Sequence, residues 1–226
     1  MLSVIIPTLN AEKTLPQTLN ALIPGAVSGL VKEVVISDGG SADSSLMIAE
    51  DAGCTIVTGP AGRGVQLGRG AQAARSDWLL FLHADTALST GWEEEVGHFM
   101  AQTESHAYAA VFRFALDDFR PQARRLETLV TIRCKLFALP YGDQGLLIHR
   151  SLYEQLGGYA QTPLMEDVDM IRRIGRKRLI YLRSQAMTSA ARYTAEGYVR
   201  RPLRNLFCLS LYFLRVPPRL IARLYG

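Results

Sequence analysis

Several carboxylates in this chain directly follow apolar runs, and this placement suggests metal and phosphate chemistry. The run Leu79–Leu82 leads straight into His83-Ala84-Asp85. Four consecutive apolar residues are typical of a strand that is covered by helices on both faces. Such a strand delivers the residues after it to the carboxyl edge of the sheet, where open α/β folds bind ligands. We therefore predict that Asp85 lies at this edge and holds a divalent cation, with diphosphate oxygens completing the coordination shell.

Other polar loops are predicted to reach the same edge. The segment Pro7–Glu12 follows a first predicted strand, and Asp38–Asp43 follows a second. Glycines 39 and 40 allow the backbone to approach a ligand closely, and the Asp38 carboxylate can accept hydrogen bonds from a base or a ribose. Further along the chain, the acidic pair Glu166-Asp167 offers a carboxylate that can deprotonate an incoming hydroxyl.

The elements that must position these groups alternate through the first hundred residues, which predicts a Rossmann-like, doubly wound parallel sheet. The predicted strands are Val4–Pro7, Val34–Ser37, Thr55–Val57 and Leu79–Leu82. The predicted helices are Glu12–Ile23, a segment from a cap at Ser41 or Asp43 to Ala52, a segment from the Gly59–Gly64 turn to Arg75, and Trp92–Gln102. Close packing of a helix on the sheet is the expected use of the glycines in and after that turn.

The second half of the sequence is less regular. We expect strands over Tyr108–Leu116, Gly145–His149 and Arg178–Leu182, with the first of them antiparallel at an edge of the sheet. We expect helices over Pro121–Ala138, Ser151–Leu156 and Asp167–Ile174. From Glu196 onward, apolar and basic residues mix at helical spacing. The sequence thus predicts one domain over residues 1–195 and a basic amphipathic helical extension, residues 196–226, packed on it.

The charge of the chain is unevenly distributed. The 226 residues carry a formal net charge of +4, but residues 1–112 hold 5 basic and 12 acidic side chains, whereas residues 170–226 hold 13 basic and 1 acidic. A region this basic favours an anionic partner, either substrate phosphates or acidic lipid headgroups. The alternative is a solvated helical face. No groove-reading or stacking motif accompanies the charge, so we do not expect nucleic-acid binding.

The location expected from the sequence is the cytoplasm. The first residues carry no signal-peptide pattern, no apolar run approaches the ~20 residues of a membrane span, and the three cysteines show neither zinc nor disulfide spacing. Within the basic region, Tyr198–Phe207 reads as an amphipathic stretch that can lie on an anionic membrane at its inner face, which would suit a lipid-linked acceptor. The alternative is that Leu206–Leu214 packs back on the domain.

Four segments, occurring in order, resemble the family 2 glycosyltransferases of GT-A fold: Ser3–Asn10, Glu33–Asp43, Leu79–Asp85 and Glu166-Asp167. Within this family the chain is most similar to a small bacterial subgroup with the run Leu-Phe-Leu-His-Ala-Asp-Thr, here Leu80–Thr86. The resemblance implies an inverting transferase that moves a sugar from a nucleotide-diphosphate sugar, usually UDP-linked, to a hydroxyl acceptor. It also implies Mn²⁺ or Mg²⁺ as cofactor.

The resemblance assigns roles to residues of this sequence. The implied donor-binding residues are Pro7, Thr8, Glu12, Asp38 and Asp85, and Asp85 is also the implied metal ligand. To these we add Gly39, Arg63 and Ala84 as candidate donor-binding residues. Asp167 is the implied catalytic base, with Glu166 beside it. The segment Tyr141–Gly145 is implied to border the acceptor site, and the candidate acceptor-binding residues are Asp143, Gln144 and Arg192. Either Arg63 or Arg192 can oppose the charge that develops on the departing diphosphate.

Two positions depart from the family pattern. His83 occupies the first acidic position of the family's Asp-x-Asp, and a neutral imidazole lends no charge against a diphosphate-bound cation. Gly39 replaces the second aspartate of Asp-Asp-Gly-Ser, which removes one ribose contact. A non-catalytic nucleotide-sugar binding protein, in which His83 marks a decayed metal site, is therefore an alternative. A nucleotidyltransferase ranks last, because the Pro7–Glu12 loop lacks the glycines such enzymes need there.

Overall fold

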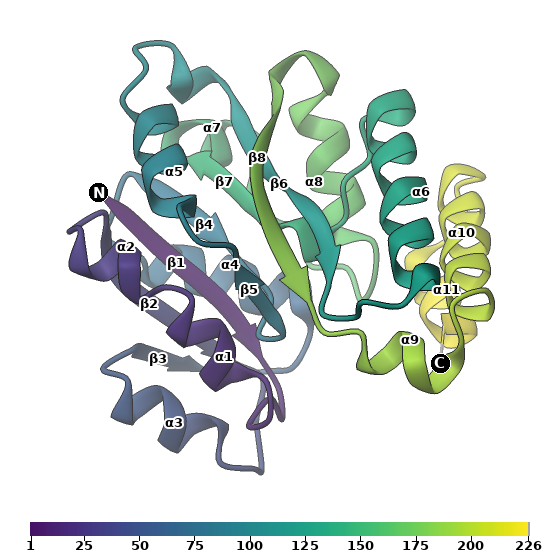
Figure 1. The fold of residues 1–226 in the computed structure, drawn as a ribbon, viewed down its shortest axis with the longest axis horizontal. Coiled ribbons are helices and arrows are strands. Elements are labelled where there is room, and N and C mark those ends of the chain that lie inside the picture. Colours follow the sequence, from purple (N-terminus) through teal and green to yellow (C-terminus); the bar gives the residue numbers. More distant parts are fainter. Residues whose placement is uncertain (226) are drawn as a thin grey trace.

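The first part of the chain alternates strands and helices as expected. The computed structural model describes residues 1–225, and Figure 1 shows its course. The strands are β1 (Leu2–Thr8), β2 (Val31–Asp38), β3 (Thr55–Thr58) and β4 (Trp78–Phe81), and the helices are α1 (Leu15–Asn20), α2 (Ile23–Val27), α3 (Ser45–Asp51) and α4 (Arg63–Ala73). The expected single helix Glu12–Ile23 is instead two helices, because Pro24 cannot continue the hydrogen-bond ladder of the first and starts the second.

The rest of the chain adds four strands, further helices and three 3₁₀ turns. The strands are β5 (Thr86–Leu88), β6 (Ala109–Leu116), β7 (Leu146–His149) and β8 (Leu179–Thr188). The helices are α5 (Trp92–Met100), α6 (Pro121–Phe137), α7 (Arg150–Gln155), α8 (Glu166–Ile174), α9 (Ala191–Glu196), α10 (Arg200–Phe213) and α11 (Pro218–Tyr225). The 3₁₀ turns are η1 (Ser105–Ala107), η2 (Gly142–Gln144) and η3 (Arg176–Arg178).

The strands form one eight-stranded sheet in the order β3-β2-β1-β4-β7-β6-β8-β5. The first four strands are parallel, as predicted. Beyond β4 the sheet is mixed, because β7 runs antiparallel to both β4 and β6, while β6 and β8 are parallel. The prediction that β6 lies at an edge is wrong: it is paired on both sides, and the antiparallel edge strand is β5.

β4 is buried on both faces, which confirms the interpretation of its apolar run. Leu79 and Phe81 pack on one side of the sheet with residues of α4, α7 and α8. Trp78, Leu80 and Leu82 pack on the other side with residues of α1 and α5. The two layers of helices are visible in Figure 1. Because helices cover both faces, the residues that follow β4 can reach a ligand only at the edge formed by the carboxyl ends of the strands.

β8 is longer than expected. The strand predicted over Arg178–Leu182 continues to Thr188, although Arg183, Ser184 and Gln185 interrupt the apolar alternation. The Glu95 carboxylate accepts hydrogen bonds from the backbone N–H groups of Arg183 and Ser184, at 2.7 and 2.8 Å, where the register with β6 shifts. The Glu95 side chain of α5 thus supplies hydrogen-bond acceptors for two backbone N–H groups that do not pair with β6.

The C-terminal helices pack against the same core as the sheet. Cys208 and Leu209 of α10 and Ile221 of α11 are buried in the cluster that also holds Ile171 and Ile174 of α8. Among the described residues, no helix combines the length and the hydropathy that crossing a bilayer requires. The division into residues 1–195 and 196–226 stays a prediction.

Glycines let α4 approach the sheet, and two of them form a matched pair for a test. A Cβ at Gly70 would lie 2.4 Å from Cγ2 of Ile5 on β1, whereas a Cβ at Gly68 would meet nothing within 4 Å. We expect Gly70→Ala to lower the free energy of unfolding by about 1–3 kcal/mol, because α4 must move off the sheet. Gly68→Ala should raise it by up to ~1 kcal/mol, since alanine is the better helix former.

Urea unfolding of both variants, followed by far-UV circular dichroism, measures the difference. Equal effects of the two substitutions would contradict close packing of α4 on β1.

Candidate active site

The mixed sheet brings distant segments to one edge. β7 pairs antiparallel with β4 through Phe81 and Leu146, so the residues that precede β7 lie beside those that follow β4. β8 is parallel to β6, and its carboxyl end at Thr188 reaches the same edge. The antiparallel return through β7 therefore places Asp143 next to Asp85, although 58 positions separate them in the sequence.

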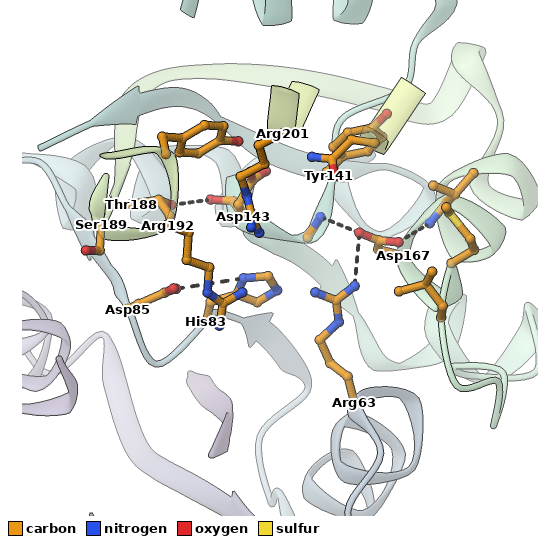
Figure 2. A pocket seen from close by; sticks show the side chains of 16 residues that line it. Arg63, His83, Asp85, Tyr141, Asp143, Asp167, Thr188, Ser189, Arg192 and Arg201 are labelled. Atoms are coloured by element: carbon orange, nitrogen blue, oxygen red, sulfur yellow. Dashed lines mark hydrogen bonds and ion pairs between the residues drawn. The ribbon is translucent and has the colours of Figure 1, made fainter. Parts of the chain in front are cut away.

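A cavity of about 120 Å³ lies at this edge. Figure 2 shows its polar side chains pointing toward one another from several elements. It is lined by Arg63, His83, Asp85, Tyr141, Gly142, Asp143, Leu164, Met165, Asp167, Val168, Thr188, Ser189, Arg192, Tyr193, Arg201 and Asn205. Of the residues suggested by the sequence, Arg63, Asp85, Asp143, Asp167 and Arg192 meet here.

Asp167 is held firmly in the first turn of α8. Its Oδ2 accepts a hydrogen bond from the Gly142 N–H at 2.9 Å and lies 3.5 Å from Nη2 of Arg63, and its Oδ1 accepts from the Val168 N–H at 2.8 Å. Burial works to raise the pKa of Asp167, but the Arg63 charge and the two N–H donors outweigh it and lower the pKa. Asp167 is thus an ionised carboxylate facing the cavity.

Glu166 lies behind the cavity and not in it. Its side chain is fully buried and its Oε1 forms a short ion pair with Nε of Arg63. Burial raises the pKa of Glu166, and the Arg63 charge opposes that rise. Because Glu166 and Asp167 are consecutive helical residues, their side chains point in directions about 100° apart. The two residues therefore have different roles: Glu166 holds Arg63 in place, and Asp167 faces the cavity.

Asp143 is a half-buried residue whose carboxylate has one buried oxygen without a partner. Its Oδ1 is inaccessible to solvent and accepts no hydrogen bond from any described residue. Burial raises the pKa of Asp143 to about 6, although Arg133 opposes the rise. An orphaned, hard oxygen donor beside Asp85 is the type of group that a cation or a hydroxyl ligand completes.

His83 is neutral near pH 7. Burial, followed by the charge of Arg63, lowers its pKa to about 4. Its Nδ1 lies 4.0 Å from Oδ1 of Asp85, and a Cβ at position 142 would come within 2.8 Å of its Nε2. The lack of a side chain at Gly142 therefore allows η2 to lie close to both His83 and Asp167.

The cations of the cavity differ in their partners. Arg63 is engaged by Glu166 and Asp167. Arg201 is 7% exposed and pairs with Glu196. Arg192, on α9, lines the cavity and forms no ion pair or hydrogen bond with a described residue. Arg192 is thus the cation best placed to meet an anionic ligand.

The loops after β1 and β2 are fastened to each other beside the cavity. The Glu12 N–H donates to Oδ2 of Asp43, and the Ser44 N–H donates to Oε2 of Glu12. The Gly39 N–H donates to the carbonyl of Thr8, and Nε2 of Gln66 donates to that same carbonyl. None of Pro7, Thr8, Glu12, Asp38 or Gly39 lines the cavity.

Two of these loop residues, Thr8 and Asp38, have buried side chains whose hydrogen bonds are made within the protein. The Thr8 hydroxyl donates to the carbonyl of Ile6. The Asp38 carboxylate, 1% exposed, accepts hydrogen bonds from the N–H groups of Gly40 and Ser41 and from the Ser41 hydroxyl. In this structure Asp38 shapes its loop, and it does not present a carboxylate to the outside.

Gln144 and Ala84, also suggested by the sequence, lie outside the cavity. The Gln144 amide is buried: Nε2 donates to the Phe112 carbonyl at 2.9 Å, and Oε1 accepts from the Cys134 thiol. Both ends of the Gln144 amide are therefore used inside the core, and its contact with an acceptor stays a prediction. The carbonyl of Ala84 accepts from the Thr18 hydroxyl at 3.1 Å.

The cavity also contains residues that the sequence did not single out. Thr188 ends β8 and Ser189 follows it, while Arg201 and Asn205 lie one helical turn apart on α10. The i, i+4 spacing of Arg201 and Asn205 places both on one face, which is the only sequence signal that could have grouped them. Nothing in the sequence indicates that this face turns toward Asp85.

The carboxylates of the cavity suit a hard divalent cation that takes most of its ligands from water and from a bound phosphate group. Within residues 1–225, no three His, Cys, Asp or Glu side chains gather as a ready metal site. Asp85, with the orphaned oxygen of Asp143 nearby, supplies carboxylate oxygens of the kind that Mg²⁺ and Mn²⁺ accept together with waters and phosphates. The residues thus fit a cation that is completed by a bound diphosphate.

Comparison with curated proteins finds mycobacterial glycosyltransferases. The chain is 37% identical over 95 residues to a PGL/p-HBAD biosynthesis glycosyltransferase of Mycobacterium bovis, covering 39% of this chain and 36% of that protein. It is 31% identical over 93 residues to a glucosyl-3-phosphoglycerate synthase of Mycolicibacterium paratuberculosis, covering 37% and 28%. The match thus spans about a third of the length of these relatives.

Solved structures share the fold. Glucosyl-3-phosphoglycerate synthase from Mycobacterium tuberculosis, in complex with Mn²⁺, UDP and glucosyl-3-phosphoglycerate, is 19% identical with a TM-score of 0.61, covering 96% of this chain and 81% of that one. TarS of Staphylococcus aureus is 17% identical with a TM-score of 0.63, covering 93% and 39%. These similarities show that the fold is GT-A.

The sequence model of the family "Glycosyl transferase family 2" matches residues 3–185, which include nearly all of β1, most of β8 and ten of the sixteen residues that line the cavity. The chain belongs to glycosyl transferase family 2.

Proposed function

We propose that this protein transfers a sugar from a UDP-linked donor to a hydroxyl acceptor, with inversion at the anomeric carbon and with the help of Mn²⁺ or Mg²⁺. One observation carries the proposal: a single cavity gathers carboxylates from three distant segments, Asp85, Asp143 and Asp167, together with the free cation Arg192. Membership of the family supports it, as does the binding of UDP and Mn²⁺ by a protein of similar fold.

On the donor side, we assign the diphosphate to the space between Asp85 and Arg192. Bond cleavage leaves a nucleoside diphosphate with added negative charge. A divalent cation held by Asp85 would stabilise that charge. Arg192 can approach the diphosphate from the α9 side, whereas Arg63 is needed to balance Glu166 and Asp167. The nucleoside would then lie along the fastened loops of β1 and β2, near Pro7, Glu12 and Gly39.

On the acceptor side, we assign Asp167 as the base and Asp143 as the group that orients the acceptor hydroxyl. Asp167 is ionised and faces the cavity, so it can take the hydroxyl proton as the oxygen attacks. Attack from the face opposite the leaving diphosphate inverts the anomeric centre and needs only this one base. The orphaned Oδ1 of Asp143 can accept a hydrogen bond from a second sugar or acceptor hydroxyl.

The donor site can be tested by thermal shift with a panel of nucleoside diphosphates, with and without Mn²⁺. We expect UDP with Mn²⁺ to raise the Tm most, on the order of 5–10 °C at saturating ligand. Asp85→Ala should abolish the Mn²⁺-dependent part of this shift. The control is Asp77→Ala, which changes an exposed aspartate just before β4, at its opposite end. An unchanged shift in Asp85→Ala would overturn the placement of the diphosphate.

The base can be tested with a matched pair on α8. Asp167→Asn should retain the UDP shift but lower kcat for sugar transfer by about 10²–10⁴-fold, because the hydroxyl proton has no acceptor. Asp169→Asn, which changes an aspartate paired with Arg173 on the same helix, should leave transfer unchanged. Transfer to a panel of acceptors, followed by UDP release, measures both. Binding by the wild type without turnover on any acceptor would favour the non-catalytic alternative.

The burial of Asp143 predicts a dependence of stability on pH. Its pKa of about 6 in the folded protein exceeds the ordinary value of 3.8, so its stabilising contribution is complete below pH ~4 and is lost as the pH rises through 6. Asp143→Asn should therefore raise the free energy of unfolding by about 1–3 kcal/mol at pH 8, and by much less at pH 4. Urea titrations at both pH values test this, with the exposed Asp51→Asn as control.

A destabilised Asp143→Asn at pH 8 would show that the carboxylate is satisfied in the folded protein.

A further inference from the structure

The outward face of α10 is apolar. Its exposed large apolar side chains are Leu203, Leu206, Phe207, Phe213 and, at the end of the helix, Leu214, which are between 46% and 75% exposed. Their positions, i, i+3, i+4, i+10 and i+11, fall on one stripe of an α-helix. A helix on the surface of a globular domain ordinarily turns its polar face to water. α10 instead exposes mainly apolar side chains, with Ser210 as the polar residue between Phe207 and Phe213 on the stripe.

The opposite face of the same helix is already used by the fold. Cys208 and Leu209 are buried in the core, and Arg201 and Asn205 line the cavity. The apolar stripe is therefore not a core face that has been left open by poor packing, because α10 has a complete core face of its own. One helix diameter, about 10–12 Å, separates the stripe from the cavity.

The segment that carries the stripe is basic, and the acidic residue paired with it, Glu196, already binds Arg201 and Arg204. From Gly197 to the end of the sequence there are six arginines and no aspartate or glutamate. Arg200, Arg215, Arg219 and Arg223 are exposed. α11, which packs on α10, adds exposed Leu220 and Leu224, 49% and 57% exposed.

We propose that the exposed face of α10 and α11 is a docking surface for a bilayer rich in anionic lipids. An apolar stripe flanked by arginines matches both parts of a membrane interface, since the leucines and phenylalanines enter the acyl boundary and the guanidinium groups meet lipid phosphates. Figure 1 shows α10 and α11 at the end of the molecule opposite α2 and α3, so a flat surface can reach them without meeting the sheet.

The charge distribution disfavours a second copy of the chain as the occupant. A two-fold contact between α10 stripes would bring exposed arginines of both copies together, with no acidic side chain from this segment to oppose them. A bilayer with anionic headgroups supplies the opposite charge. Docking in this orientation would hold the cavity at headgroup height, and this inference stands on the surface alone, independently of the proposed transfer reaction.

Co-sedimentation of the full chain with vesicles tests the proposal. The probes are vesicles of phosphatidylcholine alone and vesicles with about 30% phosphatidylglycerol. We expect strong binding only to the anionic vesicles, weakened by high salt. The double variant Leu206→Ser/Phe207→Ser should bind roughly tenfold more weakly. The control, Val27→Ser/Met47→Ser, changes two exposed apolar residues on α2 and α3 and should bind like the wild type.

A second variant, Phe207→Trp, keeps an aromatic ring at the stripe and reports its environment. Its fluorescence should shift to the blue with anionic vesicles and stay unchanged with phosphatidylcholine alone. Absence of wild-type binding to anionic vesicles, or unchanged binding of the α10 double variant, would overturn the proposal. Sedimentation velocity tests whether a second copy of the chain covers the stripe instead. If the wild type is a dimer that does not bind vesicles, and Leu206→Ser/Phe207→Ser dissociates it, the stripe is a dimer contact.

Discussion

The interaction of Arg63 with Glu166 and Asp167 makes the site electrostatically possible. The cavity edge holds four carboxylates, Asp85, Asp143, Glu166 and Asp167, close enough for their charges to influence one another. A buried carboxylate without an opposite charge destabilises a protein by several kcal/mol. Arg63 opposes two of the four at once, and the Gly-rich turn that precedes α4 lets it reach them from the first position of that helix.

The remaining imbalance defines where a ligand belongs. Asp143 has an oxygen with no partner and a raised pKa, while Arg192 has no counterion among the described residues. A diphosphate and a cation would complete both groups at the same time. The two groups to which the proposed function assigns ligands are thus both incompletely paired in the free protein, which is the usual relation between stability and a preorganised site.

α10 links this site to the surface of the molecule. One of its faces contributes Arg201 and Asn205 to the cavity, another fills the core with Cys208 and Leu209, and the third is the exposed apolar stripe. A change in how the stripe is covered would act on the cavity through a single rigid element. The two expectations for the tail, packing on the domain and an exposed amphipathic face, therefore describe different faces of one helix and do not exclude each other.

The sequence by itself determined the parallel first half of the sheet, the placement of Asp85 after β4 and the acidic pair at the start of α8. These features depend on local patterns: apolar runs, turn glycines and a helix start. Tertiary structure alone decided that β7 returns antiparallel beside β4, and hence that Asp143 meets Asp85. It also committed Asp38 to its own loop and Gln144 to the core, because hydrogen-bond partners such as Ser41 and Phe112 are found only once the chain has folded. The position of α10 in the fold could not be predicted either, because the exposed stripe is more apolar than the face that holds Arg201, Asn205, Cys208 and Leu209, and only packing decides which face is buried.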